Sequence, residues 1–479
     1  MTKKPSSIST DRTHNLSIKG KSFHIKLISL SLLAFLIRVI YVIVFEKGDL
    51  LNGDAFYYHH ASKLLVDGLG FTEPYRYIFG GEQELLFVSD PSYVPETANR
   101  NLPIGHIEPT AGHPPLWVIV LAFPIFLGFS SVLIQQIFCS FIGAIGVFAI
   151  GWATREIAGD KAGLIASGLA SIYAFLWLND GLLMSETLVV MLVALLIGFS
   201  WRLYNKNSLS TLILFSLIGG LAALTRVELI IAIPFLAIPI LRDSSQELKK
   251  RLLNYSAVGL IVAATVSPWV IRNLTQFEEP VLISNGSGIL LAQTNCDATY
   301  FGDKQGYWEY LCGLPQPLGE NGEATDESVR DKEYRKRGLD YASQHKRHLL
   351  TNVVPKRMAR LWGFYAPIEQ LRADKLVEGR SFSLSFIGLL QYYLLIPFSI
   401  LGVVRLKQSK KFITPVITIP IIATLIAAMS MGTTRYRVSA EVPLVICAAI
   451  GISYLVGSLK NLNTEPDTEL AYNSATTKC

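Results

Sequence analysis

The sequence has few charged residues and few cysteines for its length. Only 17% of its 479 residues are Asp, Glu, Lys or Arg, whereas 51% are hydrophobic. A soluble domain carries about 25% charged residues, so this composition excludes an ordinary soluble protein. The five cysteines are too few for a disulfide-rich secreted scaffold. The sequence also lacks a phosphate-binding glycine loop and the His/Cys spacing of a metal site, and we predict no metal site from such motifs.

Apolar runs long enough to cross a bilayer occupy much of the chain. We expect ten spans, at Lys26–Phe45, Val132–Trp152, Ala162–Leu178, Thr187–Trp201, Thr211–Leu224, Val227–Leu241, Asn254–Val270, Leu384–Val404, Ile413–Met431 and Val442–Leu459. A further apolar stretch, Pro115–Gly128, is shorter. The predicted fold class is an all-α polytopic membrane protein, a bundle of about ten transmembrane helices with external juxtamembrane helices and a loop-rich external cap.

The positions of Lys and Arg predict on which side each loop lies. Residues 1–25 are basic, and no cleavage pattern follows the next apolar run, so we expect a cytoplasmic tail and an uncleaved first span. If Pro115–Gly128 crossed the membrane, the basic clusters Arg242–Arg251 and Arg405–Lys411 would lie outside, against the positive-inside rule. We therefore predict that this stretch does not cross.

This topology divides the chain into five parts. They are a cytoplasmic tail (1–25), an N-terminal transmembrane module (26–271) with an external loop (46–130), a large external cap (272–383), C-terminal transmembrane helices (384–459) and a second cytoplasmic tail (460–479). The net charge of +6 is explained by the cytoplasmic loops and by lipid phosphate, and no basic, aromatic-interleaved stripe indicates nucleic acid. The expected partners therefore include membrane lipids.

The same topology gathers the conspicuous charged residues at the outer face. They are Asp54, Glu186, Arg226, Glu228, Arg272, Arg435 and Arg437. Charge beside hydrocarbon is costly unless it is paired or faces water, so these residues indicate a functional site. Structural explanations stay open: the two residues Asp54 and Glu186 could cap helices, Arg226 could simply pair with Glu228, and the last two arginines could snorkel.

The cap contains two further features of interest. Cys296 and Cys312 share it in a compartment that we expect to be oxidising, so they could form a disulfide. Tyr307 and Trp308 lie in the same segment. Such aromatic side chains suit stacking on sugar rings, although anchoring at the membrane interface explains them as well.

Several short motifs occur in a fixed order along the chain. Arg38 and Tyr41 precede Gly53-Asp54, Tyr58 and the HPPL motif at His113–Leu116. Later motifs are MSE at Met184–Glu186, GGLAALTRVE at Gly219–Glu228, SPWVIRN at Ser267–Asn273 and RYRVSAEVPL at Arg435–Leu444. Together they resemble the GT-C-fold membrane glycosyltransferases of the family 39 type, which include protein O-mannosyltransferases and lipid A aminoarabinose transferases.

The resemblance implies a reaction and roles for particular residues. It implies transfer of a single sugar from a polyprenyl-phosphate donor to a hydroxyl acceptor, with inversion at the anomeric carbon. Asp54 would be the general base and Glu186 a second catalytic carboxylate, because an inverting displacement needs a base for the acceptor proton. The predicted ligands of the donor phosphate are Arg435, Arg437, Arg226 and Arg272, since guanidinium groups bind phosphate bidentately. The predicted substrate-binding residues are Tyr58, His113, Glu228, Tyr307 and Trp308.

The sequence leaves other points open. Some relatives carry an Asp-Glu pair where this chain has Asp54 followed by Ala55. Carboxylates alone can hold a divalent cation, so metal dependence stays open, and no cofactor is assigned. The alternatives to single-sugar transfer are an oligosaccharide transferase that uses a lipid diphosphate and a polyprenyl-lipid flippase. Flippases and transporters usually show paired broken helices near the midplane, so an enzyme is favoured. We expect a prokaryotic cytoplasmic membrane, with the active site outside.

Overall fold

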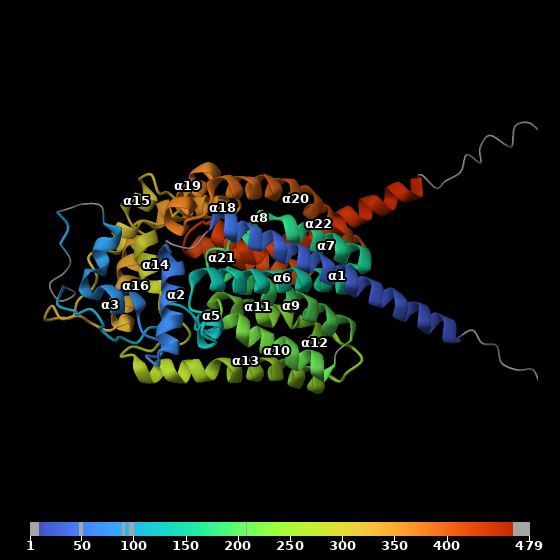
Figure 1. The fold of residues 1–479 in the computed structure, drawn as a ribbon, viewed down its shortest axis with the longest axis horizontal. Coiled ribbons are helices and arrows are strands. Elements are labelled where there is room, and N and C mark those ends of the chain that lie inside the picture. Colours follow the sequence, from blue (N-terminus) through green and yellow to red (C-terminus); the bar gives the residue numbers. More distant parts are fainter. Residues whose placement is uncertain (1–8, 47–50, 89–91, 95–99, 207, 463–479) are drawn as a thin grey trace, which may run out of the picture.

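The protein is built from helices and loops. The computed structural model describes residues 9–46, 51–88, 92–94, 100–206 and 208–462. Within these ranges the β-structure is one isolated bridge between Thr72 and Pro109. The predicted all-α polytopic fold is therefore confirmed (Figure 1). Parts of both predicted cytoplasmic tails, residues 1–8 and 463–479, lie outside the described residues.

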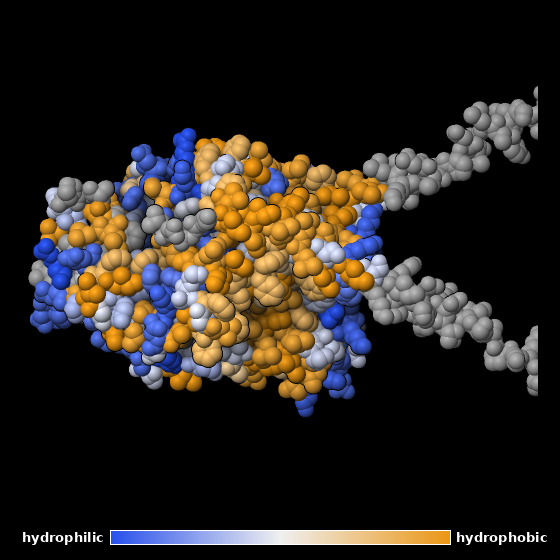
Figure 2. Space-filling model, viewed as in Figure 1, coloured by the Kyte–Doolittle hydropathy of each residue, from blue (hydrophilic) through white to orange (hydrophobic). Residues whose placement is uncertain are grey.

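Six helices of the described part are long and apolar enough to cross a membrane. They are α1 (Ser9–Phe45), α6 (Val132–Ala158), α9 (Glu186–Asn205), α13 (Leu248–Gln276), α20 (Phe382–Gln408) and α22 (Thr434–Leu462). Figure 2 shows the broad apolar band that these helices present, bordered by hydrophilic residues at the end near the chain termini. This band has the composition expected of a surface that faces lipid.

The remaining predicted spans are shorter or broken helices. They are α7 (Asp160–Ile172) with α8 (Ala174–Trp177), α10 (Leu209–Ala223), α21 (Thr414–Met429), and the series η2 (Val227–Ile231), α11 (Ala232–Leu236) and α12 (Ile238–Arg242). We predicted one continuous span over Val227–Leu241, and the structure divides it. Pro234 and Pro239 lie inside it, and each lacks the backbone N–H that a continuous helix requires.

The segment between α1 and α6 begins and ends at the same end of the bundle. The two helices are antiparallel, because Leu27 lies beside Gly151 and Arg38 beside Gly143. This segment contains the short helix α5 (Leu116–Phe126). At 1.5 Å per residue, eleven residues span about half of the hydrocarbon core. The helix is therefore too short to cross the bilayer by itself. That the stretch does not cross, which the basic clusters Arg242–Arg251 and Arg405–Lys411 indicate, stays a prediction.

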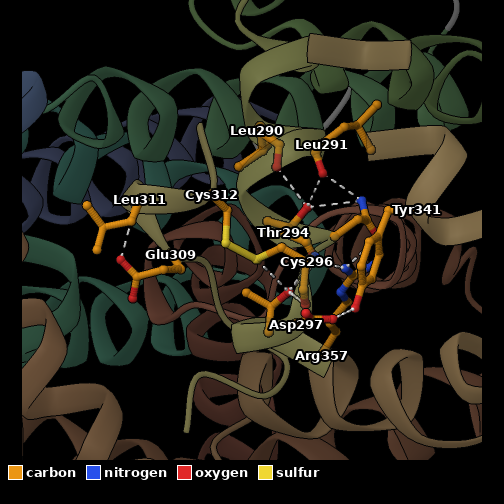
Figure 3. The surroundings of a disulfide bond; sticks show 12 residues. Leu290, Leu291, Thr294, Cys296, Asp297, Glu309, Leu311, Cys312, Tyr341 and Arg357 are labelled. Atoms are coloured by element: carbon orange, nitrogen blue, oxygen red, sulfur yellow. Dashed lines mark hydrogen bonds between the residues drawn. A yellow bond between two sulfur atoms is a disulfide. The ribbon is translucent and has the colours of Figure 1, made fainter. Parts of the chain in front are cut away.

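A cap covers the end of the bundle that lies opposite the start of α1 and the end of α22 (Figure 1). Its elements are α2 (Gly53–Val66), α3 (Pro74–Phe79), η1 (Gly80–Phe87), α14 (Ser287–Thr294), α15 (Asp297–Tyr300), η3 (Tyr310–Gly313), α16 (Glu327–Gln344), α17 (Lys346–His348), η4 (Leu349–Val353), α18 (Val354–Leu361) and α19 (Pro367–Glu378). A disulfide joins Cys296, just before α15, to Cys312 in η3 (Figure 3). The buried guanidinium of Arg357 donates to the carbonyl of Thr294 and to Asn295 beside this bridge, and so links α18 to it.

Candidate functional site

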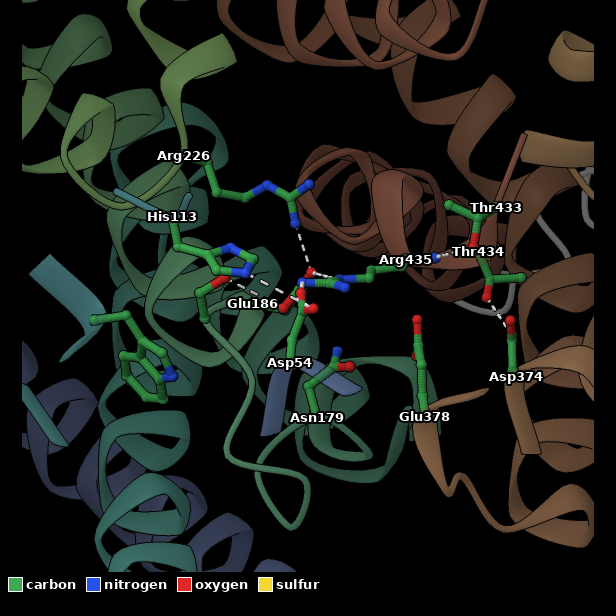
Figure 4. Close-up of polar contacts among 12 residues, drawn as sticks. Asp54, His113, Asn179, Glu186, Arg226, Asp374, Glu378, Thr433, Thr434 and Arg435 are labelled. Atoms are coloured by element: carbon green, nitrogen blue, oxygen red, sulfur yellow. Dashed lines mark hydrogen bonds and ion pairs between the residues drawn. The ribbon is translucent and has the colours of Figure 1, made fainter. Parts of the chain in front are cut away.

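Five charged or polar side chains from different elements meet at the capped end of the bundle (Figure 4). Asp54 lies in the first turn of α2, and His113 lies in the loop before α5. The other three come from the bundle: Glu186 begins α9, Arg226 follows α10, and Arg435 lies in the first turn of α22. A charged side chain costs less free energy at a helix end, outside the hydrocarbon, than within it. The ends of the bundle helices therefore bring these charged residues together.

The charges in this cluster alternate. The Arg435 guanidinium lies 2.6 Å from Asp54 Oδ2 and 2.5 Å from Glu186 Oε1. The Arg226 guanidinium lies 2.5 Å from the same Glu186 oxygen and 2.7 Å from Glu228 Oε1. An ion pair between Arg226 and Glu228 alone therefore does not explain these residues, since Glu186 contacts both Arg226 and Arg435. We call the five residues Asp54, Arg435, Glu186, Arg226 and Glu228 the charged chain.

The charged chain is partly open at the end formed by Asp54 and Arg435 and closed at its centre, Glu186. The side chain of Glu186 is 1% exposed, whereas that of Asp54 is 28% exposed and that of Arg435 is 17% exposed. A ligand that enters can therefore reach Asp54 and Arg435 directly. Glu186 holds the two guanidinium groups in place and is screened from that ligand.

Asp54 is fully ionised in this arrangement. Burial alone would raise the pKa of its carboxyl, but the nearby positive charges of Arg435 and Arg226 bring the pKa down to about 2. His113 Nε2 lies 3.8 Å from Asp54 Oδ1, and His113 Nδ1 lies 3.3 Å from the hydroxyl of Tyr58. Burial lowers the pKa of His113, and this favours a neutral imidazole. The structure thus places Tyr58 and His113 beside Asp54, and their role in substrate binding stays a prediction.

Loss of Glu186 should destabilise the fold strongly. In Glu186→Gln, two partly buried arginines would lose the buried carboxylate that they share, and removing one partner of a buried ion pair costs about 3 kcal/mol or more. We expect a lower melting temperature in detergent, measured by intrinsic fluorescence. Glu156→Gln is the matched control, because Glu156 pairs with the exposed Arg202, and such surface pairs contribute about 1 kcal/mol at most. Equal melting of the two variants would contradict the bridging role.

The cap holds the loop that carries His113. The backbone N–H of Ala111 donates to Glu327 Oε2 at 3.3 Å, and the N–H of Asn285 donates to the Ala111 carbonyl at 3.1 Å. Burial and the nearby Glu73 raise the pKa of Glu327 to about 8, and burial likewise raises that of Glu73 to about 7. Glu327 is therefore protonated at neutral pH, in contact with the loop that positions the histidine.

This contact makes the stability of the cap depend on pH. The folded-state pKa of Glu327 lies above the value of about 4.3 in the unfolded chain, so the folded state binds an extra proton and its stability falls as pH rises toward about 8. Glu327→Gln should melt at a higher temperature than the wild type at pH 8.5, with a smaller change between pH 6 and pH 8.5. Glu333→Gln, at an exposed position of α16, is the control and should follow the wild type. An unchanged pH slope in Glu327→Gln would refute this role.

Two arginines that we predicted as phosphate ligands lie elsewhere. Arg272 donates to the carbonyls of Thr110 and Phe71 at 3.0 and 3.1 Å, and it ties these loops to α13. Arg437 is 1% exposed, and its Nε lies 2.5 Å from Glu441. Arg435 and Arg437 are two positions apart on one helix, which turns their side chains in different directions. Neither Arg272 nor Arg437 has the position of a phosphate ligand in this structure.

The predicted aromatic residues Tyr307 and Trp308 lie in the cap. Tyr307 is 4% exposed, and the guanidinium carbon of Arg360 lies 5.3 Å from its ring centre. Its ring centre is 6.0 Å from that of Trp308. Tyr307 is thus a packed residue of the cap and does not offer a free face for a sugar.

Sequence reasoning missed several polar residues around the charged chain. Asp180 forms a fully buried ion pair with Arg38 at 2.7 Å and accepts from Thr187 at 2.7 Å, beneath the start of α9. Arg38 lies in an apolar span and needed a partner, and this signal could have identified Asp180. Glu378 and Arg380 lie in a polar segment of the cap, where charged residues are common and give no such signal. Within the described residues, no three His, Cys, Asp or Glu side chains are grouped as a metal site.

Comparisons with known proteins bear on both fold and site. Residues 112–271 match the family model of dolichyl-phosphate-mannose-protein mannosyltransferases, and this part contains His113, Glu186, Arg226 and Glu228. The chain also superimposes on the archaeal oligosaccharyltransferase AglB from Archaeoglobus fulgidus in complex with an inhibitory peptide and a dolichol-phosphate. That superposition has a TM-score of 0.54 and 14% identity, and it covers 93% of this chain and 51% of the other. The chain has the GT-C glycosyltransferase fold.

Further structures agree on this GT-C fold. The apo form of the Archaeoglobus fulgidus oligosaccharyltransferase matches with a TM-score of 0.52 and 14% identity, over 92% of this chain and 52% of the other. The chain spans about half the length of these structures. No match was found among curated protein sequences. These structures and the match over residues 112–271 thus agree on the fold of a multi-pass membrane protein.

Proposed function

We propose that the protein transfers a single sugar from a polyprenyl-phosphate donor to a hydroxyl acceptor at the outer face of the membrane. One observation carries this proposal: the partly open Arg435 contacts a partly open carboxylate, Asp54, at the capped end of a GT-C bundle. A cation for the phosphate and a base for the acceptor are thereby placed side by side. The acceptor is a hydroxyl of a protein, a lipid or a glycan.

An apolar groove supports a lipid-linked donor. It has a volume of about 500 Å³ and lies between α13 and the broken series η2 and α11, lined among others by Ile230, Ile233, Val262, Val266 and Ile271. Ile230 is two residues from Glu228, at the end of the charged chain. The isoprenoid tail of such a donor is apolar and would bind in the groove. Its phosphate is anionic and would bind to Arg226.

The proposed displacement uses Asp54, Arg435 and Arg226 of the charged chain. The acceptor oxygen bonds to the anomeric carbon, the bond from that carbon to the phosphate oxygen breaks, and its electron pair leaves with the phosphate. Asp54 takes the acceptor proton. The phosphate gains negative charge as it leaves, so Arg435 and Arg226 stabilise the transition state more than the bound donor.

The donor would also activate Asp54. While Arg435 is paired with Asp54, the pKa of that carboxyl is about 2, which makes it a weak base. A donor phosphate shares the Arg435 guanidinium and weakens its hold on Asp54. The pKa of Asp54 then rises, so the base becomes effective once the sugar is in place.

The basic loops support an outward-facing site. Arg242, Lys249 and Lys250 lie around the start of α13, and Arg405 and Lys407 lie in the last turns of α20. All of these lie at the end of the bundle opposite the cap. Since positive loops stay in the cytoplasm, the cap and the charged chain face outward.

Transfer of a whole oligosaccharide is the second candidate. The superposition on an oligosaccharyltransferase over 93% of this chain favours it. The two reactions differ in the leaving group, which is a lipid monophosphate in the first and a lipid diphosphate in the second.

A donor panel tests both. The protein is reconstituted in lipid and given polyprenyl-phosphate monosaccharides and lipid-diphosphate oligosaccharides, and the released carrier is measured. We expect free polyprenyl phosphate from at least one monosaccharide donor. Release of lipid diphosphate alone would favour the oligosaccharide reaction, and movement of the carrier across the bilayer without any release would favour a flippase.

A further inference from the structure

The last turn of α19 reaches the site from the cap. The Val377 carbonyl oxygen would lie 3.4 Å from a Cβ built on Gly53, the residue before Asp54. Gly53 has a φ of +49°, a conformation that favours glycine. The end of α19 is therefore packed directly against the start of α2, and this contact places Glu378 close to Asp54.

A fully buried arginine fixes Glu378 in this position. Arg380 Nε lies 2.7 Å from Glu378 Oε2, and the Arg380 side chain is 1% exposed. The same guanidinium donates to Asn179 Oδ1 at 2.9 Å and to Thr434 Oγ1 at 3.4 Å. Asn179 lies just before α9, which begins with Glu186, and Thr434 begins α22, which carries Arg435. Arg380 therefore connects Glu378 to both of these elements.

Glu378 faces the charged chain. In Figure 4 its carboxylate lies across from Asp54 and points toward Arg435. The charged groups around it are Arg380, Asp374, Arg435 and Glu186; burial and Asp374 raise its pKa, whereas the contact with Arg380 favours the ionised carboxylate. Nearby, Asn179 is 1% exposed, and its Nδ2 has no hydrogen-bond partner within the described part of the chain. A buried amide donor without a partner indicates a place where a ligand oxygen can bind.

The sign of the charge decides which substrate Glu378 contacts. A carboxylate repels the donor phosphate, which binds at the arginine side, and attracts a hydrogen-bond donor such as a hydroxyl. We propose that Glu378 is an acceptor-binding residue: its carboxylate accepts a hydrogen bond from the acceptor hydroxyl and holds that oxygen beside Asp54. This inference rests on the proposed function. Some relatives carry a Glu directly after the Asp, where this chain has Ala55. In this proposal Glu378 of the cap is the second carboxylate on the acceptor side.

Kinetics with Glu378→Gln test the inference. The best donor of the panel is used with two acceptor probes, a threonine-containing peptide and n-octyl β-glucoside, and the better probe is titrated. The variant replaces a charged hydrogen bond by a neutral one, so we expect the acceptor KM to rise about tenfold while the donor KM stays within about twofold. Glu378→Asp should recover part of the acceptor affinity.

A matched control separates binding from structure. Glu369 is on the same helix and, like Glu378, pairs with a buried cap arginine, Arg360, at 2.9 Å. Glu369→Gln should leave both KM values unchanged. The inference is overturned if Glu378→Gln keeps the wild-type acceptor KM, if both its KM values rise together, or if Glu369→Gln behaves in the same way. Wild-type protein that releases no carrier from any donor would instead overturn the proposed function, and this inference with it.

Discussion

Asp54→Asn is expected to reduce the release of polyprenyl phosphate by at least about a hundredfold, the usual contribution of a general base. Asparagine keeps the size of the side chain and accepts a hydrogen bond, but it cannot take the acceptor proton. The substitution also removes the carboxylate that lies 2.6 Å from Arg435. That guanidinium then becomes freer to bind phosphate, so donor binding should persist while turnover is lost.

Single-turnover release of the carrier in lipid, together with binding of the donor at equilibrium, measures both quantities. Asp67→Asn is the control, because Asp67 is an exposed residue just after α2. Release by Asp54→Asn at the wild-type rate would leave the enzyme a transferase but would remove Asp54 as the base.

Arg435→Gln is expected to lower kcat/KM for the donor by a factor of about 10² to 10³, as for the loss of a donor that stabilises a developing oxyanion. Arg435 is the only member of the charged chain that contacts both Asp54 and Glu186. Its loss removes the proposed phosphate ligand, and it also raises the pKa of Asp54, because burial still raises that pKa and the main positive charge that lowers it is gone.

Arg435→Lys distinguishes a phosphate ligand from a structural cation. Lysine keeps the charge but cannot form the two parallel hydrogen bonds of a guanidinium, so an intermediate rate is expected. Arg372→Gln, at an exposed position of α19, is the control and should keep the wild-type rate. If Arg435→Gln and Arg372→Gln have equal kcat/KM values for the donor, Arg435 does not act on the phosphate.

Much of this architecture could be predicted from the sequence because its causes are local. A span of about twenty residues is recognised from the hydropathy of those residues alone, and the basic loops around α13 and α20 predict the orientation. A charge beside hydrocarbon is conspicuous in the same way, and the sequence alone therefore singles out Asp54, Glu186, Arg226 and Arg435. The proline breaks at Pro234 and Pro239 are visible too, although hydropathy alone merges η2, α11 and α12 into one span.

The rest of the site depends on distant contacts. Arg435 and Arg437 are equally basic and equally placed in the sequence, and only the packing of α22 turns the second toward Glu441. Glu378 lies in a polar cap helix whose sequence resembles that of any solvated helix. Its approach to Asp54 follows from the docking of α19 on α2, which no pattern within either helix encodes.

The groove beside α13 determines how the effective concentration of the donor is defined. Ile271, which lines it, is 61% exposed, so the groove opens sideways toward lipid. A donor that arrives by this route diffuses in two dimensions, and its effective concentration is a mole fraction of the membrane. Adding inert phospholipid at a constant amount of donor and enzyme should therefore slow the reaction, as surface dilution does, whereas adding buffer should leave the rate unchanged.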